Sequence, residues 1–217
     1  MLNMSPQSLI SAVITLVVAL TFHEFAHAWV AKMFGDDTAE RAGRLTLNPL
    51  AHLDPIGSLM LIFVGFGWAK PVPINPYAIR RSGKAALLLV SIAGPLANFF
   101  LAILAAIPLR LNLFPVQVTS SNVLPTPFMF LYYFLFTNLA LMIFNLLPIP
   151  PLDGHEILSF LLPADLAASW ERFGSQYGIY ILITLLMIAP LLGFDFVRLV
   201  MQPVIKFISG VLLGIPQ

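Results

Sequence analysis

Long runs without a charged residue alternate with short polar segments along this chain. Residues 1–22 contain no charged residue, and the apolar run that starts at Leu9 continues to Val30. About 20 consecutive apolar residues can cross a bilayer, so this run predicts a first spanning helix over residues 9–33. Further charge-free runs predict four more spans, over residues 85–109, 128–147, 177–192 and 196–213.

The segment between the first two predicted spans has a different pattern. Its apolar core, residues 56–68, has 13 residues, which is short for a span and fits a re-entrant or interfacial element better. Gly65 and Gly67 lie near its end, and Pro71, Pro73 and Pro76 follow it. These residues predict extended chain rather than helix over the stretch that follows.

The second half of the chain ends in two closely spaced apolar runs. Only Gly193-Phe194-Asp195 separates them, which predicts a tight C-terminal helical hairpin over about residues 175–215. A short amphipathic helix is expected at about residues 154–162. We therefore expect one all-α polytopic membrane domain over residues 1–217, with five to six spans and a motif-bearing core over about residues 5–162.

Composition supports the membrane interpretation and excludes other classes. Hydrophobic residues make up 59% of the chain and charged residues 10%, and the mean hydropathy is +0.92. A soluble domain carries about 25% charged residues, so the bilayer is the expected environment. A net charge of +1 gives no reason to expect a nucleic-acid partner, and the absence of cysteine excludes disulfides and thiolate metal sites.

Basic residues are concentrated between the first span and the span over residues 85–109. This region holds seven of the eleven lysines and arginines: Lys32, Arg41, Arg44, Lys70, Arg80, Arg81 and Lys84. Residues 111–152 contain none. Because basic residues favour the cytoplasmic side, the first helix is predicted to end in the cytoplasm.

Two histidines and a glutamate interrupt the first span near that cytoplasmic end. His23-Glu24-Phe25-Ala26-His27 is an H-E-x-x-H motif. On a helix, residues i and i+4 share a face, so His23 and His27 can bind one metal ion. Glu24 lies beside that face, where it could take a proton from metal-bound water and pass it to a leaving amine. Ionisable groups at membrane depth are costly and usually functional, and imidazole with carboxylate ligands indicates zinc.

A catalytic zinc ion needs a third protein ligand, and several residues are candidates. Glu40 is too close, in the turn beyond the helix, whereas His52 and Asp54 in the proline-rich segment are possible. Asp153 is the better candidate. Prolines stop the preceding span, and irregular backbone at membrane depth is tolerated only where it is buried in protein or lines a water-filled cavity. An aspartate at this break can point into such a cavity. Asp153 could instead cap the following helix together with Glu156.

At this point the chain resembles the site-2 protease family of intramembrane zinc metalloproteases. The resemblance rests on "HEFAH" in the first span, "GPLAN" in the second and "NLLPIPPLDG" at the end of the third. The segment "GRLTLNPLAHLDPIGS…GWAKPVPINP" is similar to the compact bacterial and archaeal branch that lacks a PDZ domain. The family implies one zinc ion held by His23, His27 and Asp153, with Glu24 as the catalytic base.

The same resemblance carries further expectations. Asn145 matches a family asparagine that could hold the substrate backbone or stabilise an oxyanion, although a helix–helix hydrogen bond is the other interpretation. Residues 68–76 resemble a membrane re-entrant β-hairpin that holds substrate as an added strand. Gly94, Pro95 and Asn98 are expected to serve close packing, and His155 is expected to be a helix N-terminal residue rather than a ligand.

The function implied is hydrolysis of peptide bonds within or near transmembrane helices of membrane-protein substrates. The expected location is a prokaryotic cell membrane, with the active site toward the cytoplasm. A regulatory membrane partner is possible. Two other functions remain open: a metal or proton transporter that uses the His/Glu/Asp cluster, and an inactive scaffold that binds membrane helices.

Overall fold

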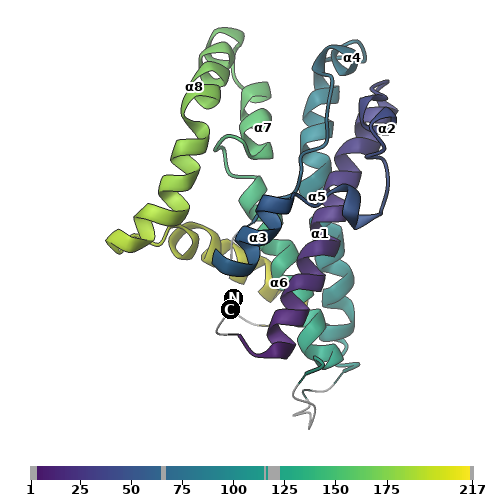
Figure 1. Cartoon of the computed structure of the whole chain (residues 1–217), viewed down its shortest axis with the longest axis vertical. Coiled ribbons are helices and arrows are strands. Elements are labelled where there is room, and N and C mark those ends of the chain that lie inside the picture. Colours follow the sequence, from purple (N-terminus) through teal and green to yellow (C-terminus); the bar gives the residue numbers. More distant parts are fainter. Residues whose placement is uncertain (1–3, 65–66, 115, 117–122, 216–217) are drawn as a thin grey trace.

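The computed structural model of the chain describes residues 4–64, 67–114, 116 and 123–215, and this part is mostly helical (Figure 1). Two 3-10 turns (Pro49–Ala51, Ala189–Leu192) and two π turns (Thr184–Ile188, Val197–Met201) accompany the α-helices. The α-helices are α1 (Pro6–Met33), α2 (Thr38–Arg41), α3 (Pro55–Val64), α4 (Pro76–Arg80), α5 (Lys84–Arg110), α6 (Pro127–Asn145), α7 (Asp153–Leu161), α8 (Ala164–Ile183) and α9 (Gln202–Leu213).

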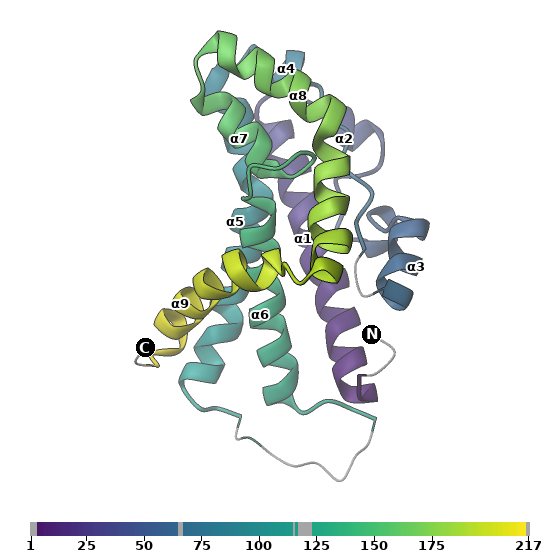
Figure 2. The same ribbon diagram turned by 90° about the vertical axis from the view of Figure 1, so that its left-hand side faces the viewer.

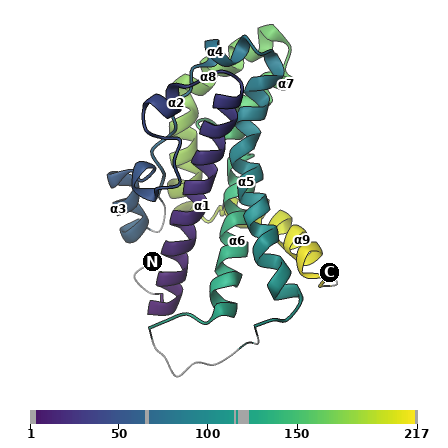
Figure 3. The same ribbon diagram turned by 90° about the vertical axis from the view of Figure 1, so that its right-hand side faces the viewer.

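Three long helices, α1, α5 and α6, form the centre of the molecule and lie side by side (Figure 3). Local sequence explains where two of them begin. The Ser5 side chain caps α1 by accepting a hydrogen bond from the Ser8 N–H. The Thr126 side chain caps α6 in the same way, by accepting a hydrogen bond from the Met129 N–H. A proline follows each cap at the first helical position, where its missing N–H costs nothing.

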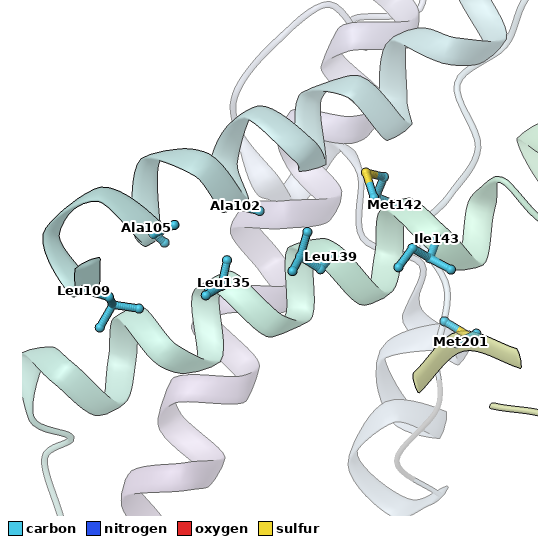
Figure 4. Packing of buried hydrophobic residues seen from close by; sticks show 9 residues of the cluster. Ala102, Ala105, Leu109, Leu135, Leu139, Met142, Ile143 and Met201 are labelled. Carbon is cyan, nitrogen blue, oxygen red and sulfur yellow. The ribbon is translucent and has the colours of Figure 1, made fainter. Parts of the chain in front are cut away.

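Small residues on α5 allow α6 to pack closely against it (Figure 4). Ala102 and Ala105 face Leu135 and Leu139 in a cluster whose members are almost fully buried. In a bilayer the lipid tails are as apolar as leucine, so close van der Waals packing rather than the hydrophobic effect favours such contacts. Met201, from the C-terminal part of the chain, closes one end of the cluster.

The chain between α1 and α5 only partly matches the predicted re-entrant hairpin. Residues 55–64 form the helix α3, and residues 67–75 are non-helical, as the glycines and prolines predicted. Within the described residues the only β pairing is one antiparallel bridge, between Leu53 and Ala69. Residues 68–76, where the hairpin was expected, are described and take part in no other strand pairing. The β-hairpin is therefore not confirmed.

The number of spans also differs from the prediction. Four helices of the described part are long and apolar enough to cross a membrane: Pro6–Met33, Ala85–Arg110, Pro127–Asn145 and Ala164–Leu192. The first three match predicted spans, and the fourth starts earlier than the predicted one. The expected span over residues 196–213 is instead a π turn followed by the 12-residue helix α9. Five to six spans are therefore not confirmed.

The last two segments are arranged differently from the tight hairpin expected over about residues 175–215. Helix α9 packs against α5 and α6, and it points away from α8 (Figure 2). Gly193 makes the turn between them with a φ of 84°. A tight turn in the sequence thus does not bring the two helices into contact along their length, and α9 packs on α5 and α6 instead.

Asp36 ties the end of α1 to the proline-rich segment. It is 1% exposed, and its carboxylate accepts hydrogen bonds from the backbone N–H and the hydroxyl of Thr38 and, at 2.6 Å, from the Asn75 N–H. Burial opposes ionisation, but the hydrogen bonds from Thr38 and Asn75 outweigh it and hold the pKa of Asp36 below its ordinary value of 3.8. The side chain of Asp36 is therefore ionised in the folded protein.

We expect Asp36→Ala to lower the free energy of unfolding by about 1–3 kcal/mol, because two partly buried backbone hydrogen bonds, from the N–H groups of Thr38 and Asn75, lose their acceptor. Folding lowers the pKa of Asp36. Its contribution to the free energy of unfolding is therefore fully present above the pKa of the unfolded chain and is lost as the pH falls through the pKa of the folded protein. Thermal unfolding in detergent at neutral and acidic pH measures both effects. Asp37→Ala is the matched control, because Asp37 makes an exposed ion pair with Arg41 that contributes little. Equal losses in the two variants would contradict this assignment.

Candidate metal centre

Three side chains from distant parts of the sequence meet at one point inside the molecule. His23 and His27 project from α1, and Asp153 is the first residue of α7. His23 Nε2 lies 3.2 Å from Asp153 Oδ2, His27 Nε2 lies 3.4 Å from Asp153 Oδ1, and the two Nε2 atoms are 3.1 Å apart. In the described part of the chain this is the one group of His, Asp and Glu side chains with its ligand atoms close enough to share a metal ion.

The position of Asp153 decides between the two interpretations of this residue. The N-cap of α7 is Leu152, and no side chain caps the helix. Asp153 lies in the first turn, with both carboxylate oxygens toward the histidines. Its Oδ2 atom is buried and accepts no hydrogen bond from the described residues. The capping interpretation is therefore wrong, and the carboxylate is oriented as a metal ligand would be.

Hydrogen bonds at the far side of each imidazole set the histidine tautomers. His23 Nδ1 lies 2.7 Å from Asn98 Oδ1, and His27 Nδ1 lies 2.7 Å from the carbonyl oxygen of Val90. The Val90 carbonyl oxygen can only accept a hydrogen bond. The Asn98 amide nitrogen donates to other groups, so its Oδ1 atom faces His23 and also accepts. Each histidine Nδ1 must therefore carry the proton. Each Nε2 then presents a lone pair to the centre. Outer partners of this kind orient metal-binding histidines.

Asn98 belongs to a buried network that joins the three central helices. Its amide nitrogen donates to the carbonyl oxygen of Ala19 on α1 and to Asn138 Oδ1 on α6. Asn138 in turn donates to Phe134 within α6. Asn98 and Asn138 are both fully buried. From the sequence, Asn98 was expected to serve close packing and Asn138 was not predicted at all. An asparagine within an apolar span is itself a signal of an interhelical hydrogen bond.

Gly94 provides the space that the two imidazoles occupy. A Cβ atom built at this position would lie 2.3 Å from His27 Nε2 and 2.6 Å from His23 Nε2, which no real contact allows. The motif "GPLAN" thus combines a glycine that admits the histidines with an asparagine, four residues later, that orients one of them. The expected close packing at Gly94 is confirmed.

Helix α8 packs on the loop that carries Asp153. A Cβ atom at Gly178 would lie 2.3 Å from Pro150 Cβ, and one at Gly174 would lie 2.4 Å from His155 Nε2. His155 also stacks on Trp170, whose indole N–H donates to the His155 carbonyl oxygen. His155 is thus a buried packing residue near the start of α7, and the close approach of α8 restricts where the Asp153 loop can lie.

The other candidates for a third ligand have different partners. Glu40 pairs with Lys32, and His52 Nε2 lies 2.8 Å from the carbonyl oxygen of Thr46. Asp54 accepts a hydrogen bond from the Gly57 N–H at the start of α3. None of the three belongs to the group around His23 and His27. The alternatives for the third ligand are therefore not supported.

Glu24 and Asn145 are the two predicted site residues that do not belong to the His23/His27/Asp153 group. Glu24 Oε2 accepts a hydrogen bond of 3.0 Å from the Val72 N–H, so the non-helical segment after α3 contacts the predicted base directly. Asn145 is the last residue of α6, and its amide nitrogen donates to the carbonyl oxygen of Leu141 one turn earlier. The structure leaves the role of both residues as a prediction.

The donor set fits a zinc ion. Two neutral imidazoles and one carboxylate, with an open position, are the ligands of many catalytic zinc sites. Two Nε2 lone pairs 3.1 Å apart repel each other unless a proton or a cation lies between them. The buried Asp153 Oδ2 atom likewise lacks a hydrogen-bond donor. A cation at this point would satisfy all three groups.

Together these features define a polytopic membrane protein whose helix bundle contains a His/His/Asp group that could hold a metal ion. Comparison with known proteins agrees. The model of peptidase family M50 matches residues 112–189, and no PDZ domain was detected. The chain is 43% identical over 180 residues to "Putative zinc metalloprotease YwhC" of Bacillus subtilis, a match that covers 82% of this chain and 80% of the relative.

A second relative is "Putative zinc metalloprotease Rip2" of Mycolicibacterium smegmatis, 34% identical over 190 residues, or 85% of this chain and 69% of that protein. The protein of the same name from Mycobacterium tuberculosis strain H37Rv is 32% identical over 186 residues, or 83% and 68%. No solved structure matched significantly. The chain belongs to the M50, or site-2 protease, family of membrane-embedded zinc metalloproteases.

We expect the detergent-purified protein to contain about one zinc ion per chain, and both His23→Ala and Asp153→Ala to lose it, because three ligands are the usual minimum for a catalytic zinc site. Elemental analysis after gentle purification measures the metal content. His52→Ala is the matched control and should retain zinc. Retention of zinc in Asp153→Ala would show that the two motifs do not form one site.

Removing the acceptor for His23 should weaken the site without removing a ligand. We expect Asn98→Ala to lower zinc affinity by about 10- to 100-fold, the usual cost of losing such an outer partner. Asn98→Asp keeps an acceptor for His23 Nδ1 and should bind zinc more tightly than the alanine variant. Competition with a fluorescent chelator measures the affinities. Equal affinity in the two variants would mean that the hydrogen bond to His23 does not orient the ligand.

Proposed function

We propose that this protein is an intramembrane endopeptidase that hydrolyses peptide bonds within or near transmembrane helices of other membrane proteins. The observation that carries the proposal is the meeting of His23, His27 and Asp153 beside Glu24, inside a bundle of membrane-length helices. Membership of a zinc metalloprotease family supports the reaction class. The location of the site among spanning helices supports the substrate class.

In this mechanism His23, His27 and Asp153 hold the metal, and Glu24 is the general base. Bound zinc would supply Lewis acidity that makes water a nucleophile near neutral pH and polarises the scissile carbonyl. Glu24 accepts the proton of the attacking water and donates it to the leaving amine. The carboxylate can do both because it follows His23 directly in α1, and so lies beside the ligand face without sharing it.

Asn145 completes the site as a group that binds the substrate. At the end of α6, its side chain precedes the loop that leads to Asp153, so both derive from the same helix break. Its amide nitrogen donates to the carbonyl oxygen of Leu141 within its own helix. Because α6 ends there, the side chain can turn toward a substrate carbonyl and stabilise the developing oxyanion.

Substrate reaches the site in an extended form, beside the non-helical segment of residues 67–75. The Val72 N–H already points to Glu24. Pro71 and Pro73 have no N–H, so the edge of the segment that carries these alternating residues cannot donate hydrogen bonds to a substrate, and its Pro71 carbonyl already binds Arg44. A cavity of about 550 Å³ lies between α4 and α8 and is bordered by Leu152, next to Asp153. It offers room for an unwound stretch of substrate.

The basic residues around α2 and α4 support an orientation with the site toward the cytoplasm of a prokaryotic cell. Substrates are then cut near their cytoplasmic ends. A regulatory membrane partner would control which substrates approach α8, which packs on α7 but has few buried residues. The transporter and scaffold functions are not favoured, since neither requires a glutamate beside a His/His/Asp metal centre.

The central test is loss of cleavage with the metal retained. We expect Glu24→Gln to bind about one zinc per chain and to lower kcat by about 10²- to 10⁴-fold, the usual contribution of a general base. A library of single-span peptides in detergent, analysed by mass spectrometry, provides the substrates. Glu40→Gln, a change at an exposed glutamate, is the control. A chelator should abolish cleavage and zinc restore it. Cleavage by Glu24→Gln at the wild-type rate would refute the mechanism.

A further inference from the structure

Arg44 is a buried cation that the mechanism leaves unused. It follows α2, and only 6% of its surface is exposed. No carboxylate pairs with it in the described part of the chain; its terminal nitrogens donate to the carbonyl oxygens of Lys70 and, at 3.3 Å, of Pro71. Burying a guanidinium is costly unless its donors are used. Here the terminal nitrogens of Arg44 bind two consecutive backbone carbonyls, whereas its Nε atom is buried without a hydrogen-bond partner among the described residues.

The second of these carbonyls leads directly to Glu24. The Pro71 C=O and the Val72 N–H are the two ends of one planar peptide group. Arg44 donates to its oxygen, and its N–H donates to Glu24 Oε2 at 3.0 Å. A cation thus lies at the negative end of the peptide dipole and a carboxylate at the positive end. In a buried site such chained hydrogen bonds strengthen one another.

The surrounding contacts prevent this peptide group from shifting or being replaced. The Lys70 N–H donates to the carbonyl oxygen of His52 at 2.8 Å, and Arg44 holds the Lys70 carbonyl with its other arm. Pro71 and Pro73 offer no N–H, so Val72 provides the one donor between them. Pro73 also restricts Val72 to extended backbone. The segment can therefore present a single N–H to Glu24.

We propose that Arg44 is a positioning residue of the protease site, which acts through the Pro71–Val72 peptide to fix the carboxylate of Glu24 beside the metal ligands. The proposal rests on the proposed function for the role of Glu24 as the base. With one carboxylate oxygen bound to Val72, the other is left to exchange protons with water and the leaving amine. Lysine cannot replace Arg44 fully, because a single ammonium group does not bridge two carbonyls in a fixed plane.

Amide hydrogen exchange tests the connection without substrate or metal. The full-length protein is purified in detergent as wild type, Arg44→Ala, Arg44→Lys and Glu24→Ala. Arg41→Ala, a change at an exposed arginine close in sequence, is the matched control. Between residues 70 and 74 only Lys70, Val72 and Ile74 carry an amide hydrogen, so mass spectrometry of short peptides resolves Val72.

We expect exchange at Val72 to accelerate about tenfold in Glu24→Ala and in Arg44→Ala, the factor for losing one hydrogen bond. Arg41→Ala should match the wild type. Wild-type exchange at Val72 in Arg44→Ala would overturn the proposal. If Arg44→Ala unfolds, exchange also rises along α5 and α6, and Arg44→Lys then decides: acceleration confined to residues 70–74 supports the proposal, and wild-type exchange overturns it.

A kinetic cycle separates this proposal from the proposed function itself. Where the wild-type protein cleaves a peptide of the library, Arg44→Ala should lower kcat, leave KM and zinc content unchanged, and add no further loss to Glu24→Ala. If Arg44→Ala lowered kcat by the same factor in the wild-type and in the Glu24→Ala background, Arg44 would not act through Glu24. A wild-type protein that cleaves nothing refutes the proposed function, whereas the exchange result at Val72 still stands.

Discussion

The structure depends on satisfying polar groups that are buried at membrane depth. His23 and His27 can present Nε2 to a metal only if each Nδ1 proton finds an acceptor, and these acceptors come from α5. Asn98 in turn needs acceptors for its own amide hydrogens, which Ala19 on α1 and Asn138 on α6 supply. One chain of hydrogen bonds therefore fixes the relative positions of the three central helices. In lipid no water could replace these partners.

The same requirement shapes the irregular segments around the site. Residues 67–75 are non-helical beside membrane-length helices. Their backbone groups are bound by the side chains of Asp36, Arg44 and Glu24 and by the backbone carbonyl oxygen of His52. Charged side chains thus serve as backbone partners where a helix or sheet would normally supply them. On the other side of the centre, α8 packs through Gly174 and Gly178 on the loop before Asp153. Both arrangements make an irregular backbone rigid enough to position a catalytic group.

The two sides of the site are not equally constrained. His23, Glu24 and His27 share one continuous helix, so the positions of their backbones relative to one another follow from the helical period alone. Asp153, at the start of α7, and the Val72 N–H, in a non-helical segment, lie on other parts of the chain, and their positions depend on contacts with distant residues such as Gly178 and Arg44. Substitutions far from the metal would therefore act mainly on the third ligand and on the base.

The sequence by itself determined the helical membrane class, the three central spans and the H-E-x-x-H face, and it made Asp153 the better of several candidates for the third ligand. These follow from local rules: the length of apolar runs, the helical period and the breaks that prolines impose. Only the tertiary structure decided the rest, including the Asn98–Asn138 pair, the departure of α9 from α8, and the use of Arg44 and Asp36 as backbone partners. Each of these depends on which helices and loops become neighbours, and a pairing between residues 26 or more positions apart leaves no periodic signal in a single sequence.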